Sequence, residues 1–62
     1  LTLRELDVLR LAADGLSNAQ IAGRLYLTLA TVKSHLAHTY AKLGAQSRTA
    51  AIATARERGL LT

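Results

Sequence analysis

The chain has 62 residues, the size of one small domain with a limited core. It contains no cysteine, so neither a disulfide nor a thiolate-bound metal can stabilise it. Eight Lys and Arg against four Asp and Glu give a formal net charge of +4, which favours a polyanionic partner. No apolar run has membrane-spanning length and no signal peptide is present, so we expect a cytoplasmic protein that makes no contact with a membrane.

Half of the residues are hydrophobic, yet Tyr26 and Tyr40 are the only aromatic ones. The core must therefore be aliphatic, and the abundant Leu and Ala residues are strong helix formers. No proline interrupts the chain. We predict an all-α fold, a compact four-helix domain over residues 1–62.

Capping signals predict the first helix. Thr2 and Glu5 form a capping box ahead of a broad apolar stripe, and Gly15 supplies a left-handed stop. Glu5 and Asp7 could also be considered as paired catalytic carboxylates. Acids in a first helical turn usually interact with the helix dipole instead, so we expect no catalytic role for them.

The next two helices form the central motif of the chain. Ser17 begins a second capping box, S-N-A-Q, which predicts a short helix that ends near Tyr26. Thr28 then caps a longer third helix over residues 29–43. A short helix, a tight turn and a longer helix form a helix-turn-helix over about residues 17–36.

A fourth, alanine-rich helix is expected after the stop at Gly44. Ser47 is its cap, and the helix runs from Arg48 to about Arg58. Its thin side chains are compatible with close packing on the core and equally with self-association, in which a second copy approaches closely.

The third helix has two contrasting faces at a helical period. A stripe that must pack on a core consists of Leu29, Val32, Leu36, Tyr40 and Leu43. The opposite face is small and free of acid, and it consists of Ala30, Ser34, Ala37 and Ala41, flanked by Lys33 on one edge and by Thr31 and His38 on the other. Such a face fits a duplex groove, although a tolerant, solvent-exposed helix would have the same composition.

Together these motifs resemble the LuxR-type (GerE-type) helix-turn-helix domain of bacterial transcription regulators. The matching segments follow one another along almost the whole chain: L-T-x-R-E, V-L-x-L-A, G-L-S-N-x-x-I-A-x-x-L, T-V-K-S-H-L, K-L-G and S-R-T. The resemblance implies sequence-specific binding of double-stranded DNA for transcription regulation, with the third helix in the major groove. It also implies that the chain is the C-terminal part of a longer regulator.

The resemblance also implies which residues bind DNA. Lys33 matches the family's DNA-contacting lysine and could reach either a phosphate or guanine O6 and N7. The other positions that carry over are Ser17, Asn18, Thr28, Ala30, Thr31, Ser34 and Ala37. Thr39 departs from the family, which usually has an aliphatic residue there. It either leaves the core underfilled or places its hydroxyl against a backbone carbonyl.

Several charged or polar residues have two plausible roles. We expect His38 to face solvent or phosphate. Arg24, Lys42 and Arg48 could contact phosphates or be ordinary solvated charges.

Enzymatic and metal-binding functions find little support. His35 and His38 are three residues apart, but no cysteine and no nearby acid completes a ligand set, so we expect no metal site and no cofactor. The chain also lacks a credible nucleophile–base pair and is too small to enclose a pocket of ordinary size. We therefore predict that it is not an enzyme.

The expected partners follow from the resemblance. The fourth helix would pair two copies, which places two third helices ~34 Å apart on successive turns of one DNA face. Because a domain of this size would pair weakly, DNA itself is expected to assemble the homodimer. RNA polymerase is a further expected partner.

Overall fold

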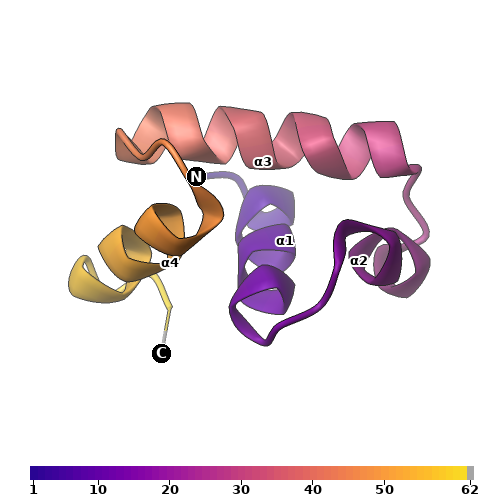
Figure 1. Cartoon of the computed structure of the whole chain (residues 1–62), viewed down its shortest axis with the longest axis horizontal. Helices are drawn as coiled ribbons and strands as arrows, with labels where there is room; N and C mark the ends of the chain where they lie inside the picture. The colour runs from indigo at the N-terminus through magenta and orange to yellow at the C-terminus, as the bar shows by residue number, and fades with distance from the viewer. Residues whose placement is uncertain (62) are drawn as a thin grey trace.

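The computed structural model describes residues 1–61, and within that range it contains four helices and no strand (Figure 1). They are α1 (Leu3–Ala13), α2 (Asn18–Leu25), α3 (Leu29–Leu43) and α4 (Arg48–Glu57). The prediction of an all-α domain with a helix-turn-helix, here α2 and α3, is confirmed. α4 ends at Glu57, and Arg58 is its C-cap.

Each helix begins where a hydroxyl side chain accepts a hydrogen bond from an otherwise unpaired backbone N–H. The Thr2 hydroxyl accepts from the N–H of Glu5 at 3.1 Å, and the Glu5 carboxylate accepts from the N–H of Thr2 at 2.9 Å. Ser17 begins the same reciprocal pair in α2. Thr28 and Ser47 cap α3 and α4 through their hydroxyls. All the predicted N-caps are therefore confirmed.

The predicted stops are confirmed as well. Gly15 follows the C-cap of α1 with φ of 92°, and Gly44 is the C-cap of α3 with φ of 67°. Residues other than glycine rarely adopt this left-handed backbone conformation. The stops therefore turn the chain sharply enough for consecutive helices to pack on one another.

α1 is the centre of the domain. Val8 and Leu9 are both fully buried, and as neighbours on α1 they enter different apolar clusters. The first cluster joins α1, α2 and α3 through Val8, Ala12, Ile21, Ala22, Val32 and Leu36. The second joins α1, α3, α4 and the segment after α4 through Leu9, Leu43, Ala51, Ala55 and Leu61.

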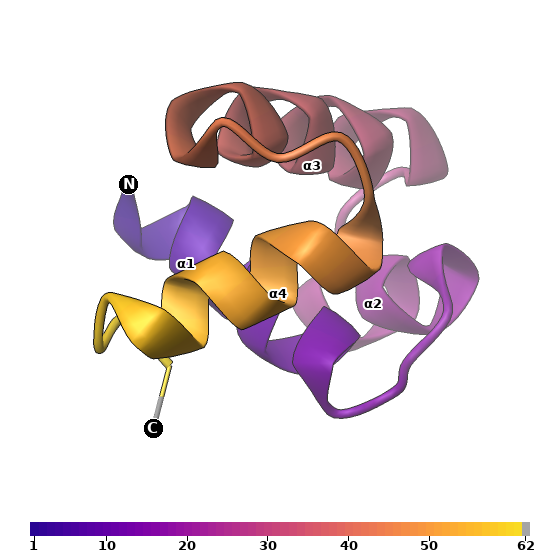
Figure 2. The same cartoon turned by 60° about the vertical axis from the view of Figure 1, so that its left-hand side comes forward.

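α3 lies across the other three helices and contacts each of them. Figure 1 shows α1 between α2 and α4, and both Figure 1 and Figure 2 show α3 along one side of these three helices. No described helix lies on the outer side of α3. None of the helices in residues 1–61 is long and apolar enough to cross a membrane.

Thr39 is fully buried in α3, and its hydroxyl donates to the backbone carbonyl of His35 at 2.8 Å. Of the two alternatives for this residue, the hydroxyl on a carbonyl is the one observed. The bond satisfies a polar group that would otherwise be costly to bury.

A buried carboxylate ties α3 to α1. Glu5 is 3% exposed, and its Oε1 accepts from the Nζ of Lys42 at 2.8 Å as well as from the N–H of Thr2. The hydrogen bond from Lys42 is the main reason that the pKa of Glu5 is lowered from 4.5 to about 2, and the bond from Thr2 adds to it. Lys42 therefore links the last turn of α3 to the first turn of α1.

The substitution Glu5→Gln should remove this link and leave a side-chain acceptor for the cap. Because the native pKa is lowered, ionised Glu5 contributes stability that is complete above pH 4.5 and is lost as the pH falls toward about 2. We expect E5Q to unfold more easily than wild type at neutral pH, by about 1 kcal/mol, and to lose less stability between these pH values. Thermal unfolding followed by circular dichroism measures both, with Asp7→Asn, at a partly exposed acid of the same helix, as control. Equal acid sensitivity in E5Q and wild type would contradict the assignment.

The alanines of α4 give a second prediction. Ala51 and Ala55 are fully buried, so close packing on the core is one reason for their small size, whereas Ala50 and Ala53 are exposed. Ala51→Leu should overpack the second cluster and destabilise the domain by about 1–3 kcal/mol. Ala53→Leu is the matched control and should change stability by less than about 0.5 kcal/mol. Equal melting temperatures for the two variants would refute this packing.

Candidate nucleic-acid interface

The inner face of α3 is anchored in the core. Val32, Leu36, Thr39 and Leu43 are buried, and Tyr40 is half-buried. Leu29 was expected on this inner stripe but is 44% exposed. It is the first residue of α3.

The outer face of α3 is open to solvent. Ala30, Lys33, Ser34, Ala37 and His38 are all exposed. Because no described helix covers this face, another molecule can reach these five side chains without unfolding the domain.

The start of α3 presents two linked hydroxyls. Thr28 accepts from the N–H of Thr31 at 3.1 Å, and its own hydroxyl donates to that of Thr31 at 2.8 Å. The Thr31 hydroxyl is the acceptor in that bond, so its proton remains available for a further acceptor such as a phosphate oxygen. Thr28 is exposed and Thr31 is half-buried.

The start of α2 is held by a residue from α4. Arg48 donates through Nη1 to the backbone carbonyl of Leu16 at 2.9 Å and through Nη2 to Oδ1 of Asn18. The Asn18 side-chain oxygen is thereby occupied, while its amide nitrogen can still donate. Exposed Ser17 lies between the two acceptors. This bridge fixes the first turn of α2 relative to α4, and nothing in the sequence pattern indicated it.

The three candidate phosphate contacts therefore differ. Arg24 is exposed on α2. Lys42 already pairs with Glu5 although half of its side chain is exposed, and Arg48 is half-buried in its bridge to the α1–α2 loop. A phosphate contact by either of the last two would compete with an intramolecular partner.

The charges are arranged asymmetrically. α2 and α3 carry no acidic residue. The acids are Glu5 and Asp7 on α1, Asp14 at its C-cap and Glu57 at the end of α4. The Nη1 atoms of Arg4 and Arg10 lie 3.8 and 4.0 Å from the carboxylate oxygens of Asp7. The helix-turn-helix is consequently the more positive part of the domain.

The two histidines are differently placed on α3: His35 is half-buried and His38 is exposed. Within residues 1–61, no three His, Cys, Asp or Glu side chains are grouped so that they could hold a metal ion.

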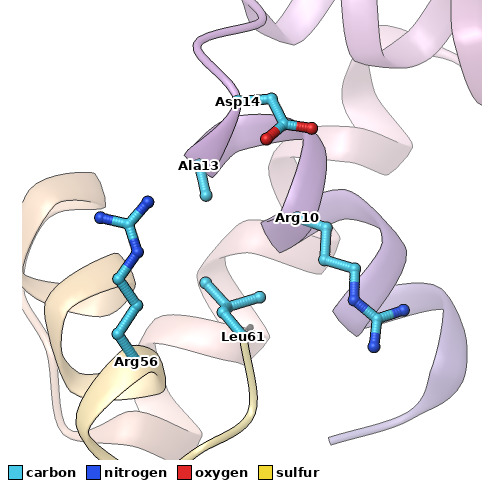
Figure 3. Close-up of a pocket in the computed structure, with 5 residues that line it drawn as sticks. All are labelled: Arg10, Ala13, Asp14, Arg56 and Leu61. Atoms are coloured by element: carbon cyan, nitrogen blue, oxygen red, sulfur yellow. The ribbon is translucent and has the colours of Figure 1, made fainter.

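A small hollow lies away from α3, between the C-terminal ends of α1 and α4 (Figure 3). Its volume is about 160 Å³, below the ~300 Å³ at which ligand pockets usually begin. Figure 3 shows Leu61 between Arg10 and Arg56, with the Arg10 guanidinium directed away from the hollow. This hollow therefore adds no substrate site to the features of α2 and α3.

Several named proteins are similar to this chain in sequence. Residues 1–61 match the family described as "Bacterial regulatory proteins, luxR family". A protein of Mycobacterium tuberculosis that carries the name of an HTH-type transcriptional regulator is 51% identical over 59 residues, or 95% of this chain. The response regulator VraR of Staphylococcus aureus is 41% identical over 61 residues, or 98% of this chain. The chain spans only 7% and 29% of these two relatives, respectively.

Solved structures show the same fold. The transcription factor GerE superposes with a TM-score of 0.95 at 32% identity, covering 100% of this chain and 92% of GerE. The response regulator ChrA of a heme-sensing two-component system superposes with a TM-score of 0.94 at 50% identity, covering 97% of this chain and 30% of ChrA.

The M. tuberculosis relative and GerE are named as a transcriptional regulator and a transcription factor, and the family as regulatory proteins, which confirms the prediction of a non-enzymatic domain. They also confirm the resemblance on which the site residues were chosen, while the individual roles of those residues stay predictions. The family match covers the whole described chain, and the fold agrees with it. The chain belongs to the luxR family of bacterial regulatory proteins.

Proposed function

We propose that this domain binds double-stranded DNA sequence-specifically by inserting α3 into the major groove. The observation that carries the proposal is the outer face of α3, which is exposed, small and free of acid while the opposite face is anchored in the core. A major groove about 12 Å wide admits one α-helix, and small side chains let the helix backbone approach the base edges. The names of its relatives as transcription regulators support this use.

Base readout on this face would rest on few polar groups. Lys33 would donate to a phosphate or to guanine O6 and N7, and Ser34 would donate to or accept from a base edge. Ala30 and Ala37 can offer only methyl contacts, for instance to thymine. Specificity would then depend largely on close fit and on the shape of the DNA.

Backbone contacts would fix the domain on the duplex. The hydroxyls of Thr31 and Ser17 and the backbone N–H of Asn18, in the first turn of α2, are available to phosphate oxygens. Thr28 and His38 are also exposed and would add to these contacts. Additional phosphate contacts would come from Arg24, Lys42 and Arg48.

Two copies would bind together on two half-sites. Ala50 and Ala53 are exposed on α4, so a second α4 could approach closely there. Pairing through these residues would place the two α3 helices ~34 Å apart. We propose that DNA assembles this homodimer, because a face of two small side chains buries little area.

In the cell, the domain would work as the C-terminal DNA-binding part of a longer cytoplasmic regulator. The short span of the chain within its named relatives supports this arrangement. RNA polymerase would then be a second partner, reached when the regulator is bound beside a promoter.

Removing the charge of Lys33 should weaken DNA binding. With a duplex selected from a random pool, Lys33→Ala should bind about 10-fold more weakly at ~0.1 M salt. If Lys33 contacts a phosphate, the slope of log affinity against log salt should fall by about 0.9 and every sequence should lose affinity equally. If it reads guanine, the preference at one base pair should flatten. Fluorescence anisotropy over a salt series measures both.

Arg58→Ala is the matched control, since it removes the same charge at the C-cap of α4, at the end that points away from α3 (Figures 1 and 2). Equal affinities for K33A and wild type at equal salt would contradict a DNA contact by Lys33. A wild-type affinity with little salt dependence would instead indicate a protein-interaction module without nucleic acid.

The proposed pairing makes a separate prediction. Ala53→Asp places like charges opposite each other in an α4–α4 contact, so it should abolish cooperative binding to a two-half-site duplex. Binding to a single half-site should stay within about 2-fold of wild type. Analytical ultracentrifugation with each duplex reports the stoichiometry. Intact two-copy assembly by A53D would rule out α4 as the dimer face.

A further inference from the structure

Tyr26 is placed in a way that the fold does not explain. It is the C-cap of α2 and has φ of 57° and ψ of 41°, the left-handed conformation. Among residues 1–61, it is the one residue other than glycine with positive φ. The residue is 94% exposed, so the aromatic ring gains almost nothing from burial.

The backbone at this position would favour a different residue. Glycine adopts the left-handed conformation without steric cost, and Gly15, Gly44 and Gly59 do so elsewhere in this chain. Only the Tyr26 backbone serves the fold, through an N–H that donates to the carbonyl of Ala22. Observed strain of this kind is a reason to look for a function of the side chain.

The position of Tyr26 suggests that function. It lies in the turn between α2 and α3, two residues before the N-cap Thr28. Leu27 between them packs on the first cluster, while Tyr26 and Thr28 are exposed on either side of it. Partly exposed Leu29 follows, so an exposed aromatic ring stands at the same end of α3 as the linked hydroxyls.

We propose that Tyr26 is an additional DNA contact, in which its hydroxyl donates to a phosphate oxygen at the edge of the groove and its ring covers the adjoining deoxyribose. This inference rests on the proposed function. With α3 in the major groove, the turn before α3 crosses the rim, where the sugar–phosphate backbone runs. Tyrosine hydroxyls are among the donors that bind phosphates in protein–DNA complexes, and such contacts carry no base information.

Two substitutions separate the ring from the hydroxyl. Tyr26→Gly removes the side chain and suits the backbone, so it should melt at the same temperature as wild type or higher. It should nevertheless bind the selected duplex about 10-fold more weakly. Tyr26→Phe keeps the ring and should lose about 5-fold, the share of the hydroxyl. Both losses should be the same on the selected and on a scrambled duplex, because a phosphate contact is independent of sequence.

Fluorescence anisotropy at one salt concentration and thermal unfolding are the measurements, with wild type and K33A run in parallel. Y26G binding within 2-fold of wild type, Y26F binding equal to wild type, or a lower melting temperature for Y26G would each overturn the inference while the proposed function stands. A loss confined to the selected duplex would do the same, since it would indicate base readout. If wild type fails to bind any duplex, the proposed function falls first and this inference falls with it.

Discussion

The packing of α3 on α1 is the contact on which the rest of this structure depends. Val32 and Leu36 enter the same cluster as Val8, and all three are buried. One face of a long helix is thereby fixed while its other face remains in solvent. Replacing a large apolar residue in such a contact by alanine commonly costs about 2–5 kcal/mol, a large share of the stability of a small domain. The exposed face exists because this buried one is well anchored.

Two polar bridges then orient the helices around that contact. Lys42 joins the end of α3 to α1 through Glu5, and Arg48 joins the start of α4 to the start of α2. The second bridge is of particular interest, because it connects the helix proposed for pairing with a helix end proposed for phosphate binding. A change at α4 therefore has a short physical route to α2, through one guanidinium.

Local features of this structure were predictable, and distant ones were not. The caps at Thr2, Ser17, Thr28 and Ser47 and the stop at Gly44 depend on residues three or four positions apart, so the sequence alone indicates them. The partners of Lys42 and Arg48 are 37 and 30 residues away, and periodicity contains no information about such pairs. The exposure of Leu29 and Tyr26 likewise depends on where the core ends.

The candidate site was predictable from the sequence where it depends on a single helix. Helical periodicity separated the outer face of α3 from its inner one, and the structure agrees for the exposure of Ala30, Lys33, Ser34, Ala37 and His38.

The most direct test of the central claim is nuclear magnetic resonance of the labelled domain bound to its selected duplex. We predict nuclear Overhauser contacts from the methyl groups of Ala30 and Ala37 to major-groove protons. If DNA contacts arise only from α1 and α4, and neither methyl group shows a nuclear Overhauser contact to DNA, the account is contradicted.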